Sequence, residues 1–151
     1  MTLVLDGWFF TRPYLWGQTK TGFLFVQRVE PGTPITWHYR HSIMKTLVWE
    51  YLEVNGNADG IVAVSTKYQS YGAGLPSLVG QGKFHQEGDW FILDIHRDFP
   101  TLSIRNGVIN NSTFTVGNRE YFLPDLMPLG SELHLYVAPL WEGYFLKKEM
   151  K

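Results

Sequence analysis

The stretch WFILDIHR, residues 90–97, shows the alternation of side chains that is expected of a β-strand. Successive residues of a strand point to opposite faces of a sheet, so every second residue shares a face. One row of this stretch is purely apolar and contains Phe91, Leu93 and Ile95. The other row mixes apolar and titratable side chains and contains Trp90, Ile92, Asp94 and His96. The pattern predicts a strand with one face in a core and leaves the role of the mixed face open.

Two other stretches show a similar mixed row. In ELHLYVA, residues 132–138, the mixed row is Glu132, His134 and Tyr136, and the apolar row is Leu133, Leu135 and Val137. In ITWHYRH, residues 35–41, the mixed row is Trp37, Tyr39 and His41, with His38 and Arg40 on the other face. Aromatic walls with a few polar groups are typical of ligand sites. We therefore expect these rows to line one shared pocket.

Frequent turn residues separate further strand-like segments. The chain has 15 Gly and 8 Pro, and its Asn-Gly and Asp-Gly pairs supply the positive φ angles that tight hairpins need. Strands are predicted at residues 2–10, 22–29, 34–41, 61–70, 78–86, 90–97, 101–105, 112–116, 119–123, 132–138 and 143–147.

The segment 35–54 differs because it contains no Gly, Pro, Asn or Asp and so offers no ordinary turn. Its apolar residues recur with the period of a helix: Ile43, Met44, Leu47, Val48, Tyr51 and Leu52. Ser42 can cap the first turn, and Asn55-Gly56 stands where a helix would stop. We predict one short helix at about residues 42–53. The alternative is a single bent strand of unusual length.

Together these patterns predict a mainly β protein of one domain, residues 1–151. We expect an antiparallel sheet of about eight to ten strands, curled into a barrel, roll or sandwich, because curling hides sheet edges and can enclose one small ligand. The short helix would pack on this sheet or inside it.

Composition excludes several classes of protein. A hydrophobic share of 44% excludes a disordered chain, and a net charge of −1 without a basic run argues against a nucleic-acid partner. The chain has no Cys, which removes disulfides and thiolate chemistry. The first ten residues do not resemble a signal peptide, and no apolar run is long enough for a membrane span. We expect a cytoplasmic protein without a membrane partner.

Aromatic residues make up 16% of the chain, and such a surplus is typical of a pocket or an interface. We predict binding of an apolar or aromatic small molecule, without a cofactor. The predicted ligand-binding residues are Trp37, Tyr39, His41, Trp90, Glu132, His134 and Tyr136. Two alternatives stay open for these rows, namely a subunit interface in a homo-oligomer and an ordinary sheet surface.

Asp94 and His96 are the predicted catalytic candidates. On a strand they point the same way, about 6.5–7 Å apart, so both can reach one ligand. A His near a carboxylate can act as general acid or base, which allows a cofactor-free isomerase, cyclase, dehydratase or hydrolase. Asp94, His96 and His134 match no metal-binding signature, so we predict no metal site. A further alternative is a viral or assembly-type structural or interaction protein.

Overall fold

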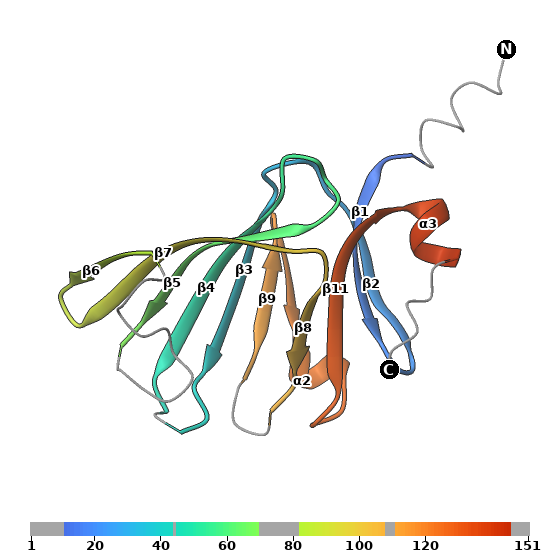
Figure 1. Cartoon of the computed structure of the whole chain (residues 1–151). Coiled ribbons are helices and arrows are strands. Elements are labelled where there is room, and N and C mark those ends of the chain that lie inside the picture. The colour runs from blue at the N-terminus through green and yellow to red at the C-terminus, as the bar shows by residue number, and fades with distance from the viewer. Residues whose placement is uncertain (1–10, 44, 70–81, 108–110, 146–151) are drawn as a thin grey trace, which may run out of the picture.

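The computed structural model describes residues 11–43, 45–69, 82–107 and 111–145, and these residues form eleven strands and two short helices (Figure 1). The elements are β1 Pro13–Thr19, β2 Gly22–Arg28, β3 Pro34–Arg40, β4 Leu47–Val54, β5 Ile61–Tyr68, β6 Lys83–Glu87, β7 Trp90–Phe99, β8 Leu102–Arg105, β9 Thr113–Val116, β10 Arg119–Phe122, α2 Leu123–Leu126, β11 Glu132–Pro139 and α3 Leu140–Phe145.

The strands form two separate antiparallel sheets. The four-stranded sheet has the order β2-β1-β11-β8, and the seven-stranded sheet has the order β10-β9-β3-β4-β5-β7-β6. Every strand pairing within these sheets is antiparallel. The predicted fold class is confirmed, since the protein is mainly β with antiparallel, sandwich-like sheets. The two sheets of the described residues do not close into a barrel.

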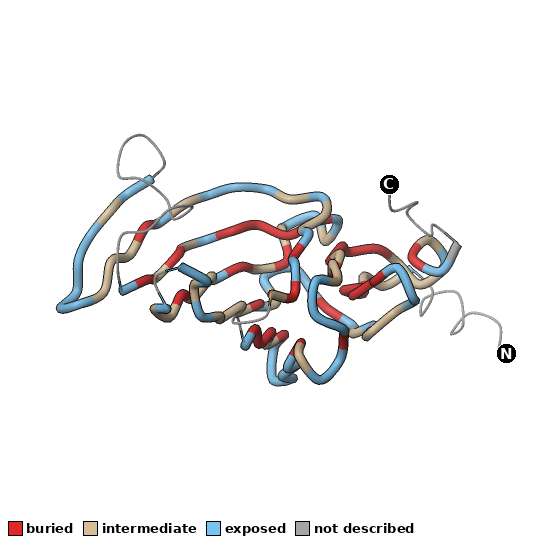
Figure 2. Tube along the Cα trace, turned by 90° about the horizontal axis from the view of Figure 1, so that it is seen from below, coloured by how far each residue is buried: buried red, intermediate tan, exposed pale blue. Residues whose placement is uncertain are grey.

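The main core lies between the two sheets. It takes alternate residues from each sheet, as a two-residue period requires. From the four-stranded sheet come Leu15, Phe25, Ile104, Leu133, Leu135 and Val137, and from the seven-stranded sheet come Ile35, Leu52, Val54, Ile61, Ala63, Phe114 and Val116. The apolar row predicted in residues 132–138 is therefore a core row. Figure 2 shows buried segments where the sheets face each other and mainly exposed chain along β6. We call the core side of each sheet its inner face and the opposite side its outer face.

The predicted helix at residues 42–53 is wrong, because residues 47–54 form β4 between β3 and β5. The chain reverses between His41 and Thr46 without a Gly or Pro. The His41 N–H donates to the Thr46 carbonyl at 2.8 Å, and Lys45 takes the positive φ of 58° that such a turn needs. Two sheet partners and the β-forming residues of LVWEYLEV outweigh the helical period of the apolar residues.

Other boundaries also differ from the prediction. Strand β1 was not predicted, because Pro13 and Gly17 interrupt the pattern. Pro13 takes the first strand position, and an added Cβ at Gly17 would lie 2.6 Å from the Phe25 ring, so the ring packs directly on the backbone. The predicted strand at 143–147 is wrong for residues 143–145, because these residues belong to α3. The predicted strand at 2–10, residue 70 of the strand at 61–70, residues 78–81 of the strand at 78–86 and residues 146–147 lie outside the described residues.

Helix α3 covers part of the outer face of the four-stranded sheet. Trp16 and Tyr136 lie there in parallel at 6.2 Å between ring centroids, within a second small cluster that also contains Tyr14 and Ala138. Gly143 of α3 rests on the Trp16 indole so closely that an added Cβ would overlap it. Neither helix of the described residues is long and apolar enough to cross a membrane.

Candidate functional site

The predicted site residues lie in three separate places. Trp37 and Tyr39 belong to the inner face of the seven-stranded sheet, with His41 in the turn that follows β3. On the outer face of the same sheet are Trp90, Asp94 and His96. On the outer face of the four-stranded sheet are Glu132, His134 and Tyr136. The expected single pocket lined by all three mixed rows is therefore wrong.

Strand register separates Trp90 from Trp37. Residues that pair directly across strands share a face. Lys67 pairs with Trp49 and with Ile92, which places Ile92 and its row mate Trp90 opposite the core. The Lys67 Nζ lies 4.7 Å from the centroid of the Trp90 ring, on this outer face.

Asp94 and His96 lie beside an irregular part of the pairing between β5 and β7. Ser65 pairs with Asp94, but Ala63 pairs with Arg97, so a bulge separates these two pairs. The His96 side chain is 79% exposed, and its Nε2 lies 3.8 Å from the carboxylate of Asp98, the next residue along the same row. This exposed position gives no support to a joint catalytic role for Asp94 and His96.

A polar cluster occurs instead on the inner face, where β3, β4 and β5 run side by side. Trp37 pairs with Glu50, and Glu50 pairs with Thr66, so the three side chains share this face. The Thr66 hydroxyl donates to Glu50 Oε2 at 2.6 Å, and the Tyr39 hydroxyl donates to the same carboxyl group. Trp37 stacks on Tyr39 with ring centroids 4.3 Å apart. We call Trp37, Tyr39, Glu50 and Thr66 the inner-face cluster.

The environment of the cluster changes how its acidic groups ionise. Burial raises the pKa of Glu50 to about 7, and the hydrogen bonds from Thr66 and Tyr39 oppose this rise. Burial also raises the pKa of Tyr39, and the charge of Glu50 and the hydrogen bond to it raise the pKa further. A carboxyl group whose pKa is near 7 is partly protonated and partly ionised at neutral pH. Such a pKa is uncommon away from functional sites.

Three of the four residues of the inner-face cluster are partly exposed, although the side chains around them are buried. Trp37, Tyr39 and Glu50 are each partly exposed. In contrast, Thr66 of the cluster and the neighbouring side chains of Val48, Tyr68 and Leu93 are at most 1% exposed. The Trp37 Nε1 is buried and has no hydrogen-bond partner among the described residues. Two partly exposed rings and a partly exposed Glu thus lie beside fully buried apolar side chains, and small-molecule sites often combine such residues.

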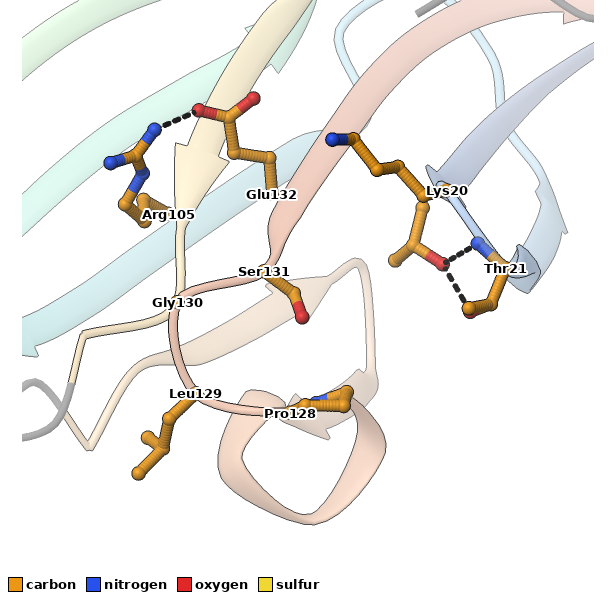
Figure 3. A pocket seen from close by; sticks show the side chains of 9 residues that line it. Lys20, Thr21, Arg105, Pro128, Leu129, Gly130, Ser131 and Glu132 are labelled. Atoms are coloured by element: carbon orange, nitrogen blue, oxygen red, sulfur yellow. Dashed lines mark hydrogen bonds and ion pairs between the residues drawn. The ribbon is translucent and has the colours of Figure 1, made fainter.

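A second candidate is a hollow of about 420 Å³ at one end of the four-stranded sheet. It lies between the β1–β2 turn and the loop 128–131, and Figure 3 shows Lys20, Arg105 and Glu132 around it. Arg105 Nη2 lies 2.6 Å from Glu132 Oε1, and this pairing is the main cause that lowers the pKa of Glu132. Next to Glu132, His134 Nδ1 lies 2.8 Å from the Ser103 hydroxyl. The His134 Nε2 also lies 3.9 Å from Glu132 Oε2, but His134 does not line the hollow, and the described residues that line it include no aromatic side chain.

The most informative residue, Glu50, was missed because its segment was assigned to a helix. Read as a strand, LVWEYLEV places Val48, Glu50, Leu52 and Val54 in one row. A carboxyl group in an otherwise apolar row was therefore the available signal. Thr66 gave no such signal, since a Thr is ordinary in a strand.

Comparison with known proteins gives one family match. The model of the family described as "Domain of unknown function (DUF1850)" matches residues 35–123, which is more than half of the chain. The matched region runs from β3 to the start of α2 and contains the whole inner-face cluster. No curated protein and no solved structure matches the chain.

Proposed function

Because the chain belongs to the DUF1850 family, whose description names no activity, we propose a function from the geometry of the inner-face cluster. We propose that the protein binds a small molecule with an apolar or aromatic body, which contacts the rings of Trp37 and Tyr39 and is oriented by Glu50.

The observation that carries this proposal is the carboxyl group of Glu50, on a largely buried but partly exposed residue, beside the two stacked rings. A carboxyl group taken out of water reduces stability unless something compensates for its lost hydration. An apolar side chain at position 50, between Val48 and Leu52 in the same row, would extend the core without this cost of lost hydration. The presence of Glu at position 50 is therefore explained better by ligand binding than by stability. Trp37 and Tyr39 supply large apolar surfaces with little entropy to lose on binding.

Screening a library of metabolite-like compounds against the full chain tests the proposal. Melting temperature identifies compounds that stabilise the protein, and amide chemical shifts in NMR spectra locate their site. We expect bound compounds to shift resonances of β3 and β4, and binding to weaken in Trp37→Phe and Glu50→Gln. Trp90→Phe, on the opposite face of the sheet, is the matched control and should bind normally. Compounds that bind equally well to all variants, or the absence of any binding compound, would show that the proposal is wrong.

An acid–base enzyme at the same place is a second candidate function, and the pKa of Glu50 near 7 favours it. General acids and bases work best when their pKa lies near the operating pH. Glu50 would exchange a proton with the substrate, and Tyr39 and Thr66 would hold its carboxyl group in place. Incubating each bound compound with the protein and following its NMR spectrum separates the two functions. A compound that is converted by the wild type but not by Glu50→Gln indicates an enzyme, and an unchanged compound indicates binding alone.

A further inference from the structure

The Glu50 carboxyl group has no positively charged partner within the described part of the chain. The physical causes that set its pKa are burial and two hydrogen bonds, and no cation is among them. The basic side chains of the adjoining strand segments point elsewhere. Arg40 donates from Nη1 to the Lys45 carbonyl, and Lys67 lies over the Trp90 ring on the outer face.

The hydrogen bonds that Glu50 accepts from the described residues leave part of its capacity as an acceptor unused. An ionised carboxylate accepts about four hydrogen bonds. The hydroxyls of Thr66 and Tyr39 occupy two of these positions and fix the orientation of the group. The remaining positions suit the N–H donors of a ligand.

The neighbouring rings favour the same kind of ligand. Aromatic faces attract cations, and the attraction is stronger where water is partly excluded. Trp37 and Tyr39 lie stacked beside Glu50, and Trp37 also stacks on Phe114 at 5.7 Å. A carboxylate beside aromatic rings is a suitable environment for an ammonium group attached to an apolar or aromatic body.

We infer that the ligand of the inner-face cluster is an amine that carries a positive charge, with the Glu50 carboxylate as its counter-charge. This inference rests on the proposed function, since it names the class of molecule that the same site would bind. It also explains why a carboxyl group lacks a basic partner from the described chain, because the ligand supplies one.

Three probes of similar size separate charge from shape: 2-phenylethylamine, which is cationic, 2-phenylethanol, which is neutral, and 3-phenylpropionate, which is anionic. Each is titrated into the full-length protein at pH 7.5 and low ionic strength, with amide chemical shifts as the readout. We expect the amine to bind about tenfold more tightly than the alcohol or better, and the anion to bind most weakly, because a hydrogen bond to a charged partner is stronger than a neutral one.

Two variants assign the preference to one residue. Glu50→Gln keeps the size and an acceptor oxygen but removes the charge, so amine binding should fall to the level of the alcohol. Glu53→Gln is the matched control, because Glu53 lies in the same strand on the outer face and its replacement should leave the preference unchanged. A single cooperative melting transition in each variant confirms that it folds.

Equal binding of amine and alcohol to the wild type, or a preference for the amine that survives Glu50→Gln, overturns the inference. Failure of all three probes to bind also overturns it. The proposed function is judged separately by the compound library. If library compounds bind at the cluster but are neutral or anionic, the protein is a binding protein and only the amine assignment is wrong.

Discussion

Replacement of Glu50 by Gln is expected to change how the stability of the protein depends on pH. Burial raises the pKa of Glu50 from the ordinary value of 4.5 to about 7 in the folded protein. Between these two pH values the folded state holds a proton that the unfolded state has released. The group therefore contributes stability that is fully present below pH 4.5 and is lost as pH rises through about 7.

The size of the effect follows from the two pKa values. At about 1.36 kcal/mol per pKa unit, a rise from 4.5 to about 7 is equivalent to about 3 kcal/mol. Most of this loss, about 2–3 kcal/mol, falls between about pH 5 and pH 8. The wild type should lose that much free energy of unfolding over this range because of Glu50. The Glu50→Gln variant lacks this ionisation and should not show the loss.

Urea unfolding of both proteins at several values between about pH 5 and pH 8 measures this difference. The substitution Glu50→Gln is not expected to disturb the fold, since the amide oxygen of the new side chain can still accept from Thr66 and Tyr39. All other ionisable side chains are the same in both proteins, so subtracting the two curves removes their contribution. Curves that stay parallel to within about 0.5 kcal/mol would refute the reasoning, because burial would then have no effect on the ionisation of Glu50.

Two further predictions concern the outer face of the four-stranded sheet. Gly143→Ala should lower the free energy of unfolding by about 1–3 kcal/mol, because the new methyl group overlaps the Trp16 indole. Gly56→Ala is its control, since no atom lies within 4 Å of the added Cβ, and thermal melting compares the two. Tyr136→Phe should cost about 1–3 kcal/mol in urea unfolding, because it leaves the buried Gln18 Oε1 without its 3.1 Å hydrogen bond; stability equal to the wild type would contradict this.

The fold class could be predicted because alternation is a local property of a strand. The alternation in residues 90–97 and 132–138 can be recognised from the sequence without knowledge of any partner strand. Leu133, Leu135 and Val137 were expected in a core and are at most 6% exposed. The positions of most strands follow from the same period and from the turn residues between them.

Residues 42–53 show where local reasoning fails. The turn from β3 to β4 uses Lys45 at positive φ, a conformation that Gly or Asn usually provides, so the sequence contains no recognisable turn there. Without a visible turn, the apolar residues of LVWEYLEV fit a helical period as well as an alternating one. The decision between them depends on hydrogen bonds to β3 and β5, which no local pattern contains.

The predicted pocket failed for a different reason. Alternation shows which residues of one strand share a face, but it does not show which faces of two strands coincide. That relation depends on strand order and on bulges. Trp37 and Trp90 both lie in mixed rows, yet register places them on opposite faces of one sheet. Trp37 and Tyr39 were correctly assigned to one face of one strand, and the role predicted for them remains a proposal.

The position of Glu50 within its row explains how a carboxyl group can lie beside a core without disrupting it. Leu52 and Val54, at the C-terminal end of β4, pack into the core between the two sheets. Val48, beyond Glu50, is fully buried but does not belong to that core cluster. Glu50 therefore stands where the contacts with the four-stranded sheet end and the wider sheet continues. At this position the row can change from apolar to polar while the packing of Leu52 stays intact. The seven-stranded sheet thus packs one end of its inner face against the four-stranded sheet, and the next part of that face carries the inner-face cluster that we propose as the ligand site.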